Sequence, residues 1–134
     1  MKKILLAVLL VLVMASVGSA KDFVFRPIIG NWNGLDSNNV AETSLPATIK
    51  VFDSATNALL SQIDVNGPVT NLVMPTFIIS VPDNTTKKLK VYATVTDSAG
   101  NSSAKSADSN EVTLVGNDTS APAGINTISI DLVQ

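Results

Sequence analysis

The chain has 134 residues, with nine basic and eleven acidic side chains and no cysteine or histidine. The lack of Cys and His excludes Ser-His and Cys-His nucleophilic catalysis, His or Cys zinc sites, and disulfides. A formal net charge of −2 without a basic cluster argues against nucleic acid or anionic lipid as a partner. We therefore expect a protein that is not an enzyme and binds no nucleic acid.

The first twenty residues have the pattern of an export signal. Lys2 and Lys3 precede an unbroken apolar run over residues 4–14, and small residues occupy positions 18–20. This order is typical of a Sec signal peptide, and the apolar run is too short to span a bilayer comfortably. We predict that residues 1–20 are removed, which leaves no stable membrane anchor and a periplasmic or extracellular protein. The remaining 114 residues carry seven basic and eleven acidic side chains, a net charge of −4.

The first stretch after the signal combines β-forming residues with turn formers. Residues 22–29 (DFVFRPII) predict a strand in which Pro27 indicates an edge or a bulge. Residues 31–39 are rich in turn formers and hold the only Trp, Trp32. Trp32 is interpreted either as a core aromatic or as an exposed platform for a sugar, and the usual burial of Trp favours the core.

A second region predicts a hairpin followed by a single strand. Residues 47–52 and 58–65 are rich in β-formers and are separated by a five-residue turn, 53–57. Residues 69–81 are interrupted by Pro75, so we predict one strand near 76–81 with a looser entry. No helical segment of useful length follows the signal.

Residues 88–114 predict the hairpin around which the rest is organised. Apolar and polar residues alternate strictly from Lys88 to Thr96, which places the apolar set on one face of a strand. Residues 97–101 have turn chemistry, and a polar stretch follows over 102–110. Residues 111–115 alternate again, which predicts a short second strand after a long polar connection.

This segment resembles the last two strands of bacterial fibronectin type III domains. The matching residues are Asp97, Ala99, Gly100, Asn101, Ser102, Ser103, Ser109, Asn110, Glu111, Val112 and Thr113, and residues 118–122 resemble the linker between tandem domains of this family. Leu89 stands where the family usually has a buried Tyr. The resemblance, together with the spacing of the predicted strands, implies an all-β, Ig-like (fibronectin type III-like) antiparallel sandwich of about seven strands over residues 21–116. Residues 117–134 are predicted to be a linker and an extra C-terminal strand, the latter from their own alternation.

The C-terminal segment is an amphipathic strand without an obvious neighbour. Ile128, Ile130 and Leu132 alternate with polar residues, and a solitary strand of this kind is not stable in water. It is expected to dock on its own sheet, or on the open sheet edge of a neighbouring subunit, or to stay disordered. Ile128, Ile130 and Leu132 are the predicted partner-binding residues.

Four oxygen-bearing side chains near the central hairpin are candidate calcium ligands. Asp97, Asn101, Asp108 and Asn110 supply the carboxylate and amide oxygens that Ca²⁺ uses. The alternative is that they are solvated turn residues, because no EF-hand or repeat pattern accompanies them. No other cofactor is indicated.

The sequence thus predicts an exported, non-catalytic sandwich module that binds other extracellular or periplasmic proteins, or itself. The expected mechanism is strand addition through the C-terminal segment. The alternative function is a carbohydrate-binding module that uses Trp32, Tyr92 and nearby loops.

Overall fold

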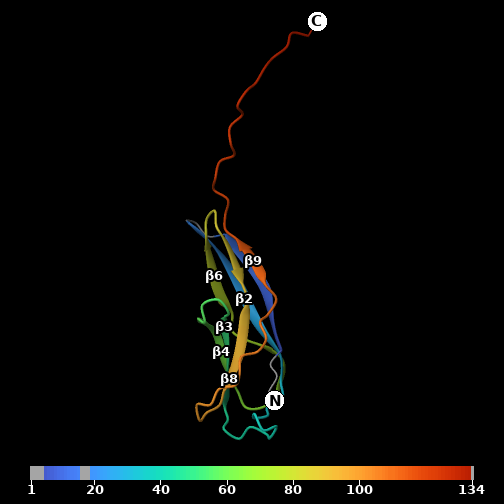
Figure 1. The fold of residues 1–134 in the computed structure, drawn as a ribbon, viewed down its shortest axis with the longest axis vertical. Helices are drawn as coiled ribbons and strands as arrows, with labels where there is room; N and C mark the ends of the chain where they lie inside the picture. The colour runs from blue at the N-terminus through green and yellow to red at the C-terminus, as the bar shows by residue number, and fades with distance from the viewer. Residues whose placement is uncertain (1–4, 16–18, 134) are drawn as a thin grey trace.

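The structure is a computed structural model that describes residues 5–15 and 19–133. All helices and strands assigned in those residues are β-strands. The body is elongated and its strands lie in two layers, with the C-terminal tail leaving one end (Figure 1). The predicted all-β class is therefore confirmed. The strands are β1 (Leu5–Ala15), β2 (Ala20–Trp32), β3 (Ala47–Asp53), β4 (Leu59–Val65), β5 (Val69–Val73), β6 (Phe77–Pro82), β7 (Thr86–Leu89), β8 (Val91–Thr96) and β9 (Val112–Val115).

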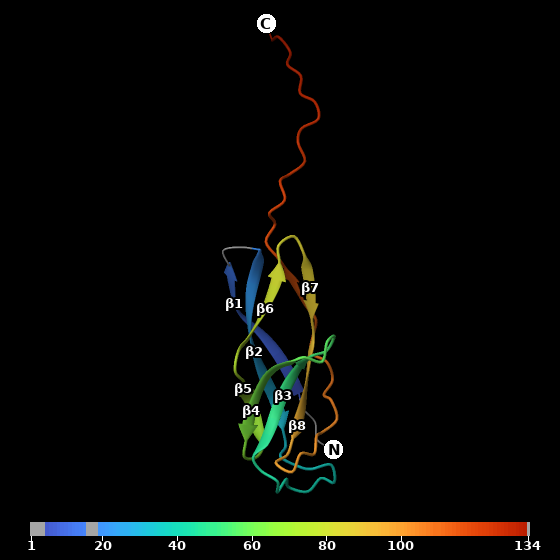
Figure 2. The same cartoon turned by 90° about the vertical axis from the view of Figure 1, so that its left-hand side faces the viewer.

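Three antiparallel sheets make up the sandwich-like body, as Figure 2 shows from the side. In the first sheet β2 is central, because it pairs with β1 and also with β5 and β6. The second sheet has the order β4-β3-β8, and the third is the pair β7-β9.

Pro27 occupies the point in β2 where one partner strand replaces another. β6 pairs with Ala20–Phe25, and β5 pairs from Ile28 onward. The Pro27 carbonyl accepts a hydrogen bond from the Met74 amide on this side, at 3.0 Å. The N–H and C=O of one residue point to the same side of a strand, and proline has no N–H. The missing N–H of Pro27 is therefore also on the side of β5 and β6, where no strand residue is paired with Pro27. The prediction of an edge or a bulge at Pro27 concerns the chain without residues 1–20. With β1 present, β2 has strands on both sides, and the proline lies where β5 replaces β6 as its partner.

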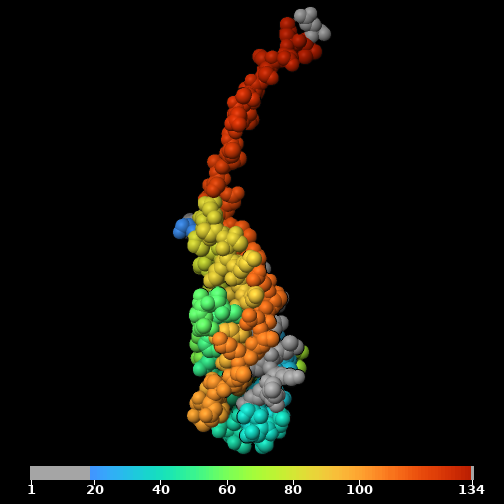
Figure 3. Space-filling model, in the orientation of Figure 1, coloured from blue at the N-terminus to red at the C-terminus, as the bar shows by residue number. Residues whose placement is uncertain are grey.

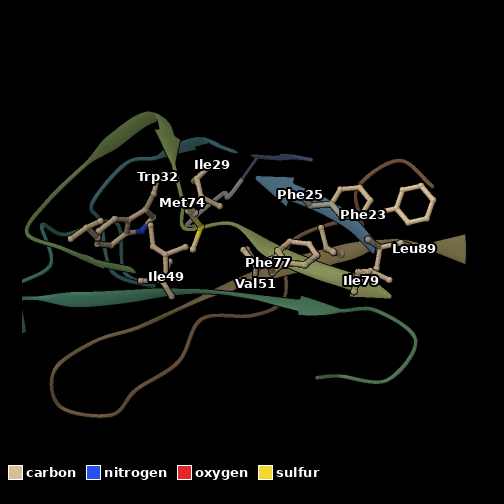
Figure 4. Packing of buried hydrophobic residues seen from close by; sticks show 14 of the residues in the cluster. Phe23, Phe25, Ile29, Trp32, Ile49, Val51, Met74, Phe77, Ile79 and Leu89 are labelled. Atoms are coloured by element: carbon tan, nitrogen blue, oxygen red, sulfur yellow. The ribbon is translucent and has the colours of Figure 1, made fainter. Parts of the chain in front are cut away.

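The core consists of the inward residues of both layers (Figure 4). Alternate residues of β2 and β3 are buried, including Phe25, Ile29 and Ile49 at 0% exposure. Phe25 stacks on Phe77 of β6 with ring centroids 5.5 Å apart. Trp32 is also fully buried, which confirms its interpretation as a core aromatic. Alternation in sequence is therefore realised as burial on one face.

The hairpin predicted for residues 47–52 and 58–65 is confirmed. β3 and β4 pair antiparallel, from Ala47 with Val65 to Phe52 with Leu59. The strand predicted near 76–81 is β6, and its looser entry contains β5. β5 was not predicted as a separate strand, because its residues alternate little and are half-exposed or exposed.

The central stretch folds back on itself as predicted, and the polar connection between its strands lies against β8. The turn closes at Asp97–Asn101, where the Asp97 amide donates to the Asn101 carbonyl. The serine-rich segment that follows then runs beside β8, and β9 continues alongside β7. The structure assigns no strand between Thr96 and Val112, so the predicted long polar connection and short second strand are confirmed; the sequence did not show that the connection lies along β8.

Serines spaced three residues apart hold this arm to β8. The amides of Ser103, Ser106 and Ser109 donate to the carbonyls of Val95, Ala93 and Val91 at 2.8–2.9 Å. Their hydroxyl oxygens accept from the amides of the same three β8 residues at 2.9–3.0 Å. Each serine therefore satisfies both backbone groups of a β8 residue, and this serine ladder covers the edge of β8 without forming a regular strand.

Candidate functional site

The C-terminal tail is anchored to the turn that joins β6 and β7. The Gly116 amide donates to the Thr85 carbonyl at 2.9 Å, and the Asn84 amide donates to the Asn117 carbonyl at 2.8 Å. The side chain of Asn84 adds bonds to Thr119 at 2.7 and 3.0 Å. The tail therefore begins from a fixed point on the body.

Beyond that anchor the tail is extended and exposed (Figure 3). Residues 121–133 are all exposed, and the structure assigns no strand to them. Ile128, Ile130 and Leu132 are 87%, 93% and 85% exposed. Within residues 117–133 the expected extra C-terminal strand is thus absent, and the prediction that it docks on its own sheet is not realised. A strand needs a neighbour to satisfy its backbone, and none of the described strands pairs with the tail.

The candidate site has two parts. One is the exposed tail, and the other is the edge of β2 that faces β1. β1 pairs with β2 from Lys21 to Asn31, so it covers almost the whole strand. β1 is at the edge of its sheet and lies inside the segment predicted as a signal peptide. On β2, Phe25, Pro27 and Ile29 face the core, while Arg26 between them is exposed.

The two aromatic residues of the carbohydrate alternative do not form a platform. Trp32 is buried in the core. Tyr92 is 6% exposed, its ring stacks on Phe52, and its hydroxyl donates to Asn57 Oδ1 at 2.8 Å. Lys105 Nζ also lies 4.5 Å from the centre of the Tyr92 ring. Both rings are occupied by the protein itself, so this alternative loses the residues on which it was based.

The four weak calcium candidates do not meet at one point. Asp97 and Asn101 close the β8 turn, where the Asn101 amide donates to Asp97 Oδ1 at 2.8 Å. Asp108 instead accepts a hydrogen bond from Ser54 Oγ at 2.8 Å, near the start of β8. Asn110 follows Ser109, which pairs with Val91. At about 3.3 Å per residue, the length of β8 puts the two groups roughly 20 Å apart.

Three carboxylates, from Asp36, Glu42 and Asp97, line a polar hollow of about 600 Å³ at the end of the body away from the tail. Each stabilises its own loop. Asp36 Oδ1 accepts from the Val40 amide at 3.0 Å, and Glu42 Oε1 accepts from the Ser44 amide at 3.0 Å. Among the described residues, no group of three or more metal-binding side chains is close enough to hold an ion.

The sequence patterns did not predict two features of the protein, the serine ladder along β8 and the exposed Arg26 on β2. The serine ladder has a signal in the sequence, since Ser103, Ser106 and Ser109 recur every third residue, but period three is neither a helix nor a strand pattern. The exposed Arg26 among buried neighbours was also missed. Its significance depends on which strand lies beside β2, and local sequence does not determine that.

A comparison with models of known protein families gave no match, and a comparison with curated proteins gave none that is significant. Among the described residues, no helix is both long and apolar enough to cross a membrane.

Proposed function

We propose that this chain is an exported, non-catalytic β-sandwich module that joins proteins by strand addition through its C-terminal segment. The observation that carries the proposal is the tail itself. Ile128, Ile130 and Leu132 lie on alternating positions of an extended segment and are 85–93% exposed. Large apolar side chains gathered on an exposed segment mark an interaction site.

The mode of binding follows from the pattern. Residues two apart share a face in a strand, so the three apolar residues form one side of it. In strand addition, backbone hydrogen bonds to a sheet edge supply affinity, and alternate side chains fill the surface behind that edge. The anchor at Gly116 and Asn84 holds the start of the tail, which reduces the chain freedom lost on binding.

The two-layer body supports the proposed relation to fibronectin type III domains. A buried Trp32 early in the chain and a final antiparallel pair of arms are both expected of that family. The body serves here as a rigid support for the tail. Export is proposed from the basic, apolar and small-residue pattern of residues 1–20.

Deletion of residues 125–134 tests the proposal. The full chain is expressed in an exporting bacterium and purified with whatever it is bound to, and its mature N-terminus is determined by intact mass. We expect the deletion to lower the particle mass measured by light scattering, or the melting temperature. If neither quantity changes, the tail docks nowhere and the proposal fails.

A pair of substituted chains provides the matched control. Replacing Ile128, Ile130 and Leu132 by Ser should reproduce the deletion, because the inward face is lost. Exchanging the polar residues of the opposite face, Thr127→Ser with Ser129→Thr, should leave mass and melting temperature unchanged. Equal effects of both sets would show that the alternating apolar face is not what binds.

A further inference from the structure

We propose that the tail of one copy occupies the β1 position beside β2 of a second copy, so that successive copies join into a polar filament. This inference rests on the proposed function and names the partner: another molecule of the same chain. It starts from the fact that a strand is accommodated at that position, since Leu5–Ala15 pairs there with β2.

Removal of residues 1–20 leaves this edge of β2 without a neighbour. β2 keeps β5 and β6 on its other side, but the groups that face β1 over Lys21–Asn31 lose their partners. An open strand edge of this length is a template for another strand. The missing donor of Pro27 does not interrupt it, because the Pro27 carbonyl points to Met74 on the opposite side.

The ends of the molecule decide which copy supplies the strand. The start of β2 and the root of the tail lie at the same end of the body. Lys21 pairs with Val81 at the end of β6, and the amide of Asn84 in the following turn donates to the Asn117 carbonyl. A tail that folds back onto its own β2 therefore starts at the same end and runs parallel to it. A tail from a second copy can enter at the Asn31 end and run antiparallel, as β1 does.

Two observations favour the second copy. Antiparallel pairing is slightly more stable per residue than parallel pairing, and it repeats the geometry of β1. The tail also continues away from its own body along the long axis and makes no reversal toward β2 (Figure 1). It is therefore directed at a neighbour stacked on that end.

Charge fixes the register. When Ile128, Ile130 and Leu132 stand opposite the buried Ile29, Pro27 and Phe25, Asp131 stands opposite Arg26. Opposite charges that face each other across strands are favourable. A shift by two residues keeps the apolar face inward but puts Asp131 opposite Ile28 or Val24. The pairing of Asp131 with Arg26 therefore selects one register.

The resulting contact is heterologous, because tail and edge are different surfaces of the chain. Each tail leaves at the Lys21 end of its own body and enters the next copy at the Asn31 end. All copies then point the same way, and a contact that does not close into a ring grows as a filament.

Introduced cysteines test direction and partner together, since the chain has no Cys of its own. In the proposed register Val133 faces Val24. The full-length chain with Val24→Cys and Val133→Cys should form a ladder of disulfide-linked multimers on a non-reducing gel after export. Facing residues of antiparallel strands lie about 5.5 Å apart, within the range that a disulfide spans.

The pair Val24→Cys with Ser129→Cys reports the parallel, intramolecular alternative. It keeps Asp131 beside Arg26 but joins one chain to itself. If this pair closes within monomers and the Val133 pair gives no ladder, the tail docks in cis and the inference is overturned. It is also overturned if neither pair cross-links.

A charge exchange gives a second readout that does not depend on disulfides. Arg26→Glu alone and Asp131→Lys alone should each shorten the assemblies seen by light scattering, and the double variant should restore them. If the assemblies of all three variants are as long as those of the unchanged chain, the register is contradicted.

Failure of this inference can be told apart from failure of the proposed function. If deletion of 125–134 still lowers mass or melting temperature while no cross-link forms, the tail binds a different protein.

Discussion

The body and the tail of this protein carry the same pattern but adopt opposite states. In β3, Ile49 and Val51 alternate with polar residues and are fully buried. In the tail, Ile128 and Ile130 alternate in the same way and are 87% and 93% exposed. β3 has β4 on one side and β8 on the other, whereas none of the strands in the described residues pairs with the tail. Alternation thus encodes the ability to form a strand, and a neighbour is needed to realise it.

The largest expected effect is in the body. Trp32→Ala removes the largest fully buried side chain and should destabilise the fold by about 3–5 kcal/mol. Urea unfolding followed by circular dichroism measures the loss. A tail-deleted chain should lose the same amount, because Trp32 is fully buried in the body whereas residues 121–133 are exposed. A different loss would mean that body and tail are energetically coupled.

The junction between the two regions is the next most sensitive place. A Cβ at Gly116 would contact the Pro82 carbonyl, so Gly116→Ala forces a backbone shift. Overpacking of this kind typically costs about 1–3 kcal/mol. Gly124→Ala is the matched control, because a Cβ there meets nothing within 4 Å. Thermal melting compares the two, and equal melting temperatures would contradict a close-packed junction.

A smaller effect is expected in the serine ladder. Ser106→Ala removes the oxygen that accepts the Ala93 amide, and an unsatisfied amide costs about 1–3 kcal/mol when buried and less here, where the bond is part-buried. Ser106→Thr keeps the hydroxyl and should recover stability. Hydrogen exchange at Ala93 should be faster in the Ala variant. Unchanged exchange would show that the ladder does not protect β8.

The smallest effect on the body is expected from the tail. Ile130→Ser should change the unfolding free energy of the isolated body by less than about 0.5 kcal/mol, as for other exposed sites. The same substitution should reduce assembly measured by light scattering. Loss of body stability without loss of assembly would reverse the roles assigned to the two regions.

Sequence patterns predicted the elements with local pairing better than those with distant partners. The β3–β4 hairpin was predicted because its two arms are joined by five residues, so pattern and pairing coincide. The serine arm was not, because its pairing with β8 uses side-chain hydroxyls in place of alternating apolar residues. β5 was missed for a similar reason, since it pairs with a strand some forty residues earlier.

For the candidate site, the sequence predicted the segment that is added as a strand, but not the sheet edge that receives it. Ile128, Ile130 and Leu132 were identified from period two alone. The β2 edge and Arg26 could not be, because a strand edge is a property of the sheet order. The carbohydrate alternative required an exposed Trp32, but Trp32 is buried. The calcium alternative required four oxygen-bearing side chains to converge, but they are divided between the two ends of β8.

Hydrogen exchange of the tail amides tests the central claim most directly. In the exported protein at a concentration where it assembles, residues 127–133 should exchange slowly, and dilution to monomers should return them to the rate of an unstructured chain. Amides that exchange at the unstructured rate at every concentration, in the presence of all copurifying proteins, would contradict strand addition by the tail.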